Sequence, residues 1–224
     1  MIKTRIFTIA LLLVSIISNA QDARIGDILD PNRNNRGLWD SASADEIKGS
    51  PYLFDEWYVG EIKTKLGSVY PNVKIKYAAY TDQLFFLTED GDERAIAREK
   101  VHYFQFNDED GKSYLFEHIP YQGYLLRVTK SENITLYKKI EKTIKEAPKN
   151  NGYNASTGKD EFVESRVYYI LTKSIVEPVP GKNDYVNIFP DKKSEIMNFI
   201  KKNKVKFKKD EKMIELVKFT QSLI

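Results

Sequence analysis

The chain has 224 residues, a formal net charge of +3 and no cysteine. The absence of cysteine excludes disulfides, thiol catalysis and cysteine-ligated metal. A length in this range predicts one large domain, or one domain with an appendage. Such a domain can bury a hydrophobic core that is stable without disulfide cross-links or structural metals. The 14 tyrosines and 12 phenylalanines favour β-sheet.

Residues 1–20 have the three zones of a cleavable signal peptide. Lys3 and Arg5 precede an apolar run over residues 6–17, and small residues end at Ala20. The run is shorter than the roughly 20 residues that a membrane-spanning helix needs. Cleavage would lower the net charge to +1 by removing the two cations. We therefore expect an exported protein, periplasmic or secreted, that does not span the membrane and has no nucleic-acid partner.

The next segment, residues 21–50, is rich in polar residues and lacks a sustained apolar period, which predicts a loosely ordered leader. Residues 51–176 contain short β-branched and aromatic runs between turn signals, which is typical of an antiparallel β-rich domain. The predicted strands are residues 57–65, 70–80, 83–87, 94–97, 101–106, 113–119, 123–129, 134–140 and 166–175.

Two acid-rich clusters, residues 89–92 and 107–111, predict hairpin turns because their glycines, Gly91 and Gly111, accept positive φ. Their oxygens also suit calcium, but neither matches the twelve-residue calcium loop. We interpret both as turns. Residues 147–160 have hardly any apolar residue and predict a loop or hairpin tip.

The C-terminal segment, residues 177–224, changes to a helical period. One helix is expected after Pro190 with Asp191 as its N-cap, and a second from Asp210. The expected fold class is α+β: an antiparallel meander, rolled as a barrel or folded as a sandwich, with an antiparallel helical pair packed on the sheet.

Three stretches resemble a group of exported bacterial proteins of unknown function. They are Gly-Ser-Pro-Tyr-Leu at 49–53, Trp-Tyr-Val-Gly at 57–60, and the ending that includes residues 189–193 and 199–204. The resemblance implies export from the cytoplasm. It implies no functional residue.

The two histidines, His102 and His118, lie in predicted strands without any metal-binding or catalytic spacing around them. We interpret each as a structural residue with a local hydrogen bond. The sequence therefore predicts no catalytic residue, no metal site and no cofactor.

Acids and aromatic residues meet at Asp55, Glu56, Trp57 and Tyr58. Paired carboxylates could hydrolyse a glycoside, but neighbouring residues on a strand face opposite sides of the sheet. Trp57 and Tyr58 are kept as a candidate aromatic contact for a sugar. The alternative is that they begin a core strand.

The most unusual feature is a run of lysines near the C-terminus, which alternate with Val205 and Phe207 at its centre. The candidate anionic-partner patch consists of Lys201, Lys202, Lys204, Lys206, Lys208 and Lys209. Such density attracts anionic lipid or acidic polysaccharide, whereas the simpler interpretation is a solvated helix face.

The expected function is a non-enzymatic envelope or secreted protein that binds another protein or a surface component such as a glycan. One alternative is a β-barrel around a small apolar ligand, which needs an interior cavity of about 300 Å³ or more. A second is a carboxylate-dependent hydrolase, which needs a cleft with convergent carboxylates.

Overall fold

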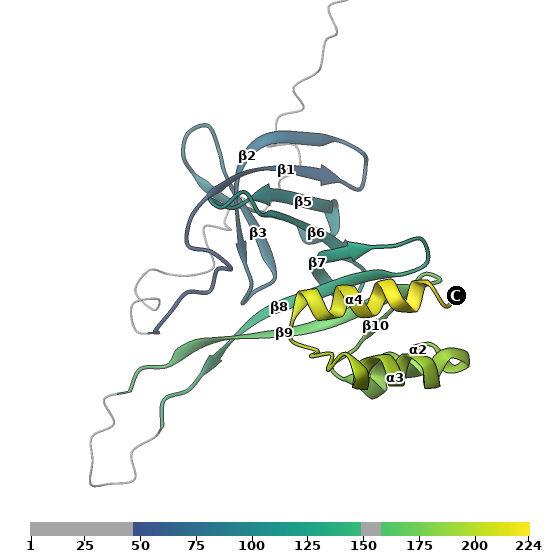
Figure 1. The fold of residues 1–224 in the computed structure, drawn as a ribbon. Helices are drawn as coiled ribbons and strands as arrows, with labels where there is room; N and C mark the ends of the chain where they lie inside the picture. Colours follow the sequence, from purple (N-terminus) through teal and green to yellow (C-terminus); the bar gives the residue numbers. More distant parts are fainter. Residues whose placement is uncertain (1–46, 149–157) are drawn as a thin grey trace, which may run out of the picture.

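The computed structural model describes residues 47–148 and 158–224. The expected signal peptide and most of the expected leader lie outside the described residues. One antiparallel sheet of ten strands, which does not close, is followed by three helices that pack against it (Figure 1). The α+β prediction is confirmed, in the form of an open sheet.

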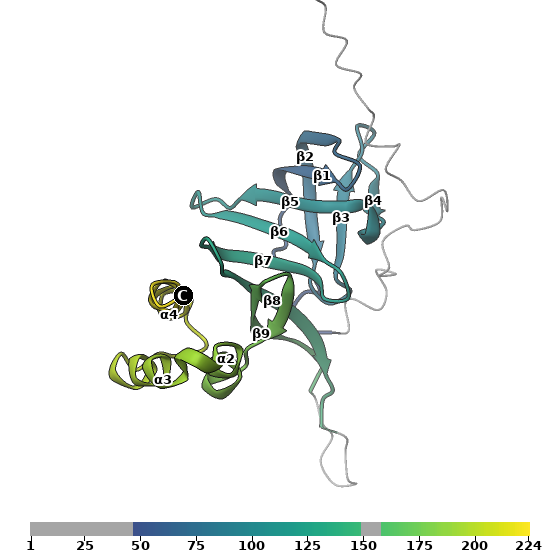
Figure 2. The ribbon, with the colours of Figure 1, turned by 90° about the vertical axis from the view of Figure 1, so that its right-hand side faces the viewer.

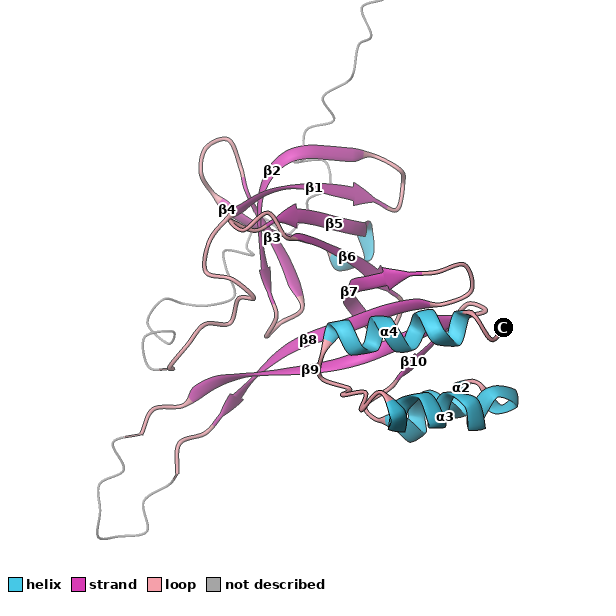
Figure 3. Ribbon diagram, in the orientation of Figure 1, coloured by secondary structure: helices cyan, strands magenta, loops and turns pink. Residues whose placement is uncertain are grey.

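The sheet order is β10-β9-β8-β7-β6-β5-β1-β2-β3-β4, so β1 lies between β2 and β5 (Figure 3). A single 3-10 turn, η2 (Arg98–Lys100), connects β4 to β5. The strands are β1 (Tyr58–Thr64), β2 (Val69–Ala78), β3 (Gln83–Leu87), β4 (Glu93–Ile96), β5 (Val101–Asn107), β6 (Ser113–Ile119), β7 (Gly123–Lys130), β8 (Thr135–Lys145), β9 (Glu161–Thr172) and β10 (Ile175–Pro178).

Most predicted strands end within two residues of the observed ones. The exceptions are β8, which continues to Lys145, β9, which begins at Glu161, and the short β10, which was not predicted. Both predicted hairpin turns are confirmed, since Gly91 and Gly111 have φ of 83° and 77° and donate to Thr88 and Asp108 carbonyl oxygens.

One face of the sheet carries both hydrophobic cores. Cross-strand partners form a continuous row of Ile62, Phe104, Phe116, Leu126, Lys138 and Tyr168 on that face. Strands β1–β8 curl around the aromatic core, in which the rings of Phe104 and Phe116 stack with centroids 4.9 Å apart. The row therefore begins inside the curled sheet and ends beneath the helices.

The three helices cover the far end of this face (Figure 2). They are α2 (Lys182–Ile188), α3 (Lys193–Lys202) and α4 (Asp210–Gln221), with the 3-10 turn η3 (Pro190–Lys192) before α3. Their apolar stripes pack on β8 and β9 in a helical core that includes Leu136, Ile170, Ile196 and Leu216. The predicted helical pair corresponds to α3 and α4.

Two details of the helix prediction need correction. Helix α2 was not predicted, because seven residues are too short to show a helical period. Asp191 is not an N-cap: it lies inside η3, and α3 begins after Lys192 without a side-chain cap. No helix in residues 47–148 and 158–224 is long and apolar enough to cross a membrane.

Candidate functional site

The lysines of the predicted anionic-partner patch all reach the surface. We refer to residues 201–209, which comprise the last two residues of α3 and the connection to α4, as the lysine segment. Its six lysines, Lys201, Lys202, Lys204, Lys206, Lys208 and Lys209, are exposed. Within the described part of the chain, none of them takes part in an ion pair.

The segment is fixed where it leaves α3. The Val205 N–H donates to the Ile200 carbonyl at 3.0 Å and the Lys204 N–H to the Lys201 carbonyl at 3.3 Å. With Lys204 at φ 49°, this is the Schellman arrangement that ends many helices. The last turn of α3 therefore sets the direction in which the lysine segment leaves.

Two apolar side chains hold the middle of the segment. Val205 and Phe207 are partly buried and pack against the helical core, and the Phe207 ring meets Tyr185 edge-on at 6.2 Å. Because these two residues alternate with Lys204, Lys206 and Lys208, their burial turns the lysines toward solvent. The observed alternation agrees with the predicted one.

The end of the segment is anchored to the sheet through Asp210, the first residue of α4. Lys138 of β8 donates to both carboxylate oxygens at 2.9 and 2.7 Å, and the Tyr168 hydroxyl donates at 2.5 Å. The Lys138 side chain is only 6% exposed. This buried group joins β8, β9 and α4 directly beside Lys209.

Acidic neighbours cancel little of the positive charge. Asp210 is paired inward with Lys138, and Glu215 is paired with Lys212 at 2.8 Å. Glu211 is exposed and forms no ion pair with any described residue. The lysine segment therefore presents a predominantly cationic surface on a fixed backbone.

Removing the strain at Lys204 should stabilise the protein. A left-handed conformation costs a residue with a Cβ roughly 1–2 kcal/mol, and glycine avoids most of this cost. We expect Lys204→Gly to raise the free energy of unfolding by about 1 kcal/mol in urea titrations. Lys206→Gly, at a position without positive φ, is the control and should lower it.

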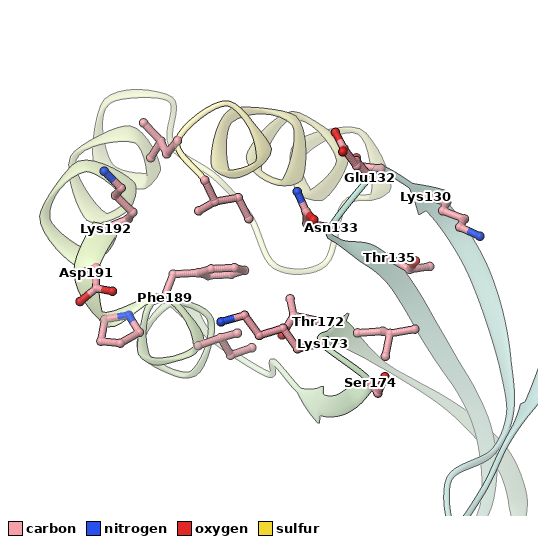
Figure 4. A pocket seen from close by; sticks show the side chains of 16 residues that line it. Lys130, Glu132, Asn133, Thr135, Thr172, Lys173, Ser174, Phe189, Asp191 and Lys192 are labelled. Atoms are coloured by element: carbon pink, nitrogen blue, oxygen red, sulfur yellow. The ribbon is translucent and has the colours of Figure 1, made fainter.

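A cleft lies at the opposite end of α4 from the lysine segment. This cleft of about 970 Å³ is enclosed by the β7–β8 turn, the β9–β10 turn, η3 and the last residues of the chain. In Figure 4 the Phe189 ring and the Lys173 side chain reach into it, while Lys130 points away. Three lysines and two acids line the cleft, so its charge selects no particular ion.

The candidate aromatic contact is mostly engaged inside the protein. The Tyr58 ring stacks on Phe106 at 5.0 Å and meets Phe54 edge-on at 5.4 Å. Trp57, which precedes β1, is partly exposed and has the Lys76 ammonium group 5.1 Å from its ring centroid. Tyr58 therefore packs against the aromatic core, and both Trp57 and Tyr58 remain partly exposed.

The neighbouring acids do not converge. Asp55 and Glu56 are exposed in the bend before β1 and not on the strand itself. In the part of the chain that the structure describes, no group of three or more His, Asp or Glu residues could hold a metal ion. The curled interior beside Tyr77 and Phe104 contains a hollow of only about 10 Å³.

The two histidines have different surroundings. His102 on β5 is exposed, with its ring 5.7 Å from that of Tyr103. His118 on β6 is half-buried, and its Nδ1 atom has no hydrogen-bond partner among the described residues. The local hydrogen bond expected for His118 is therefore not found at Nδ1.

Comparison of the sequence with protein family models and with curated proteins, and of the fold with solved structures, finds no match.

Sequence reasoning missed Lys138 as the anchor of the lysine segment. One signal was present: Lys138 is in phase with Leu136 and Ile140 on a predicted strand, so it occupies an apolar position. A lysine on a buried face needs an acidic partner. The partner, Asp210, lies 72 residues away, which no local pattern indicates.

Proposed function

We propose that this is an exported, non-enzymatic protein that binds an acidic polysaccharide of the cell surface through the lysine segment. The observation that carries the proposal is the set of six exposed lysines on a backbone anchored at both ends. The signal-peptide pattern of residues 1–20 supports export to the compartment where such polymers occur.

The anchoring matters because flexible lysines lose conformational freedom when they bind. Here the backbone between α3 and α4 is fixed by Val205, Phe207 and Asp210 before any partner arrives. A lysine near a densely anionic surface contributes about 1 kcal/mol of attraction, which salt screens over a Debye length of roughly 8–10 Å. Several lysines acting together therefore give salt-dependent binding.

A polysaccharide suits this surface better than a membrane. Peripheral membrane segments usually add exposed apolar side chains that enter the lipid. Val205 and Phe207 face inward, and the exposed large apolar residues of the described chain lie on other elements. The lysine segment therefore offers charge without an inserting group.

The test compares binding to polygalacturonate, an acidic polysaccharide, with binding to neutral dextran by isothermal titration calorimetry. We expect the full protein to bind polygalacturonate with an affinity that falls as salt rises, and not to bind dextran. Lys206→Gln/Lys208→Gln should weaken binding about 30-fold, because two lysines contribute about 2 kcal/mol.

The matched control is Lys74→Gln/Lys145→Gln, which removes two exposed lysines from β2 and β8. It should change the affinity less than twofold. Equal losses in the two pairs would show that binding follows overall charge and would contradict a role for the lysine segment. Tighter binding to phosphatidylglycerol vesicles than to polygalacturonate would contradict the choice of partner.

A further inference from the structure

The cleft at the opposite end of α4 from the lysine segment is a second candidate site. Its volume of about 970 Å³ lies in the range of roughly 300–1,000 Å³ that is usual for small-molecule sites. The β7–β8 turn, the β9–β10 turn, η3 and the last residues of the chain enclose it. The cleft is therefore large enough for an organic ligand.

Much of the lining is apolar. Six apolar residues come from β9, from the corner between α2 and η3 and from the end of the chain: Leu171, Ile188, Phe189, Pro190, Leu223 and Ile224. Phe189 is only 8% exposed and belongs to the helical core, yet its ring reaches into the cleft (Figure 4). The cleft therefore extends down to the core, and its wall suits the hydrocarbon part of a ligand.

A cation enters the cleft from the β9–β10 turn. The Lys173 side chain points toward the Phe189 ring in Figure 4. Among the residues that the structure describes, Lys173 forms no ion pair. Its ammonium group can therefore bind the anionic group of a ligand beside the apolar wall.

The remaining charges of the lining offset one another. Lys130 and Glu132 lie at the same β7–β8 turn, and Lys130 points away from the cleft. Asp191 and Lys192 are adjacent in η3. Although the total charge of the lining nearly balances, Lys173 is the charge that reaches the interior.

The turn that carries Lys173 has an uncommon conformation. Lys173 and Ser174 have φ of 47° and 70°, and Thr172 pairs with Ile175, so this is a two-residue type I′ hairpin turn. Such turns favour Asn-Gly, because a residue with a Cβ is strained in the left-handed region. Strained residues cluster at binding sites. Here the strained turn places an ammonium group in the cleft.

We propose that the cleft binds a fatty acid, with the hydrocarbon chain on the apolar wall and the carboxylate on the Lys173 ammonium group. The chain gains free energy from the apolar area removed from water, and an ammonium–carboxylate hydrogen bond is stronger than one between neutral groups. Neither contact uses the lysine segment, so this proposal and the proposed function can fail separately.

Isothermal titration calorimetry with dodecanoate, kept below its micelle concentration, tests the proposal. We expect saturable binding with equal amounts of ligand and protein at saturation. Octanoate should bind more weakly, because its shorter chain buries less apolar area. Dodecyltrimethylammonium has the same chain with a cationic head and should bind at least about tenfold more weakly than dodecanoate. Lys206→Gln/Lys208→Gln should leave the dodecanoate affinity unchanged.

A lysine variant separates the head-group contact from folding. Lys173→Asn removes the ammonium group and introduces a residue that tolerates left-handed φ, so urea unfolding should show no loss of stability. The dodecanoate affinity should nevertheless fall about fivefold. The matched control is Lys130→Gln, which removes a lysine of the same lining that points away from the cleft and should change the affinity less than about twofold.

A pair of isoleucine variants tests the apolar wall. Ile224 and Ile175 are 52% and 60% exposed, but only Ile224 lines the cleft. Ile224→Ser should weaken dodecanoate binding about fivefold, and Ile175→Ser should change it less than about twofold.

Four outcomes would overturn the proposal. The first is the absence of saturable dodecanoate binding. The second is equal affinity for dodecyltrimethylammonium, which would show that the ammonium group does not select the head. The third is an unchanged affinity in Lys173→Asn. The fourth is an equal loss in the two isoleucine variants, which would place the chain on another surface.

Discussion

The Asp210→Ala variant is expected to unfold with a free energy about 3 kcal/mol lower than that of the unchanged protein. The variant would leave the ammonium group of Lys138, whose side chain is 6% exposed, without its counterion. It would also leave the Tyr168 hydroxyl without its acceptor. Because removal of one partner from a buried ion pair exposes the full desolvation cost of the other, the loss should exceed that of any surface pair.

The control is Glu211→Ala, the exposed residue next in the same helical turn, which should change the unfolding free energy by less than about 0.5 kcal/mol. The double variant Lys138→Met/Asp210→Asn should be more stable than Asp210→Ala, because it contains no buried unpaired charge. Guanidinium unfolding followed by circular dichroism measures all three. A loss in Asp210→Ala no larger than in Glu211→Ala would contradict the anchoring role.

Lowering the pH should also lower the free energy of unfolding, because it protonates Asp210. Burial acts to raise the pKa of Asp210, but the hydrogen bonds from Lys138 and Tyr168 outweigh it and hold this pKa below its ordinary value of 3.8. A carboxyl group with a lowered folded-state pKa stabilises fully above its unfolded pKa and loses that contribution as pH falls through the folded pKa. Stability should therefore fall below about pH 3.8, and less steeply in Asp210→Ala.

The free energy of unfolding of the Gly60→Ala variant should be about 3 kcal/mol lower than that of the unchanged protein, because the added methyl group has no room. Gly60 lies in β1 between β2 and β5, beside an irregularity in the β1–β2 register. An added Cβ would overlap the Gln105 carbonyl oxygen and lie 2.6 Å from the Ile75 Cδ1 atom. The carbonyl belongs to the strand that pairs with β1, so it cannot move without opening that pairing.

Gly67→Ala is the matched control for this variant. Gly67 lies in the turn after β1 at φ 95°, with no atom within 4 Å of an added Cβ, so only backbone strain of about 1 kcal/mol is expected. Thermal and urea unfolding of the two variants measure the difference. Equal losses would show that the register irregularity in β1 absorbs the methyl group.

Local chemistry accounts for the parts of the fold that the sequence predicted. Gly91 and Gly111 fix their hairpins through positive φ, which depends only on adjacent residues. The stripe of Met213, Leu216 and Val217 on α4 follows directly from the helical period. The exposure of the patch lysines likewise follows from their alternation with Val205 and Phe207.

Long-range pairing accounts for the features of the fold that the sequence did not predict. The position of β1 between β2 and β5 depends on long-range contacts such as that of Ile62 with Phe104, 42 residues later in the chain, and no sequence period encodes it. The Asp82 carboxylate likewise accepts hydrogen bonds from Tyr77, Arg98 and Tyr124, which lie on separate strands and turns that meet only in the folded sheet.

Both borders of the open sheet are short. Strands β4 and β10 each have four residues, and β10 contains Glu177 and ends at Pro178, a residue that cannot donate from its backbone. Unpaired backbone groups at a long border would invite another polypeptide to extend the sheet. Here the edge strands present few unpaired backbone groups, which protects the molecule from fibrous self-association. Other molecules would then be bound through side chains and not through added strands.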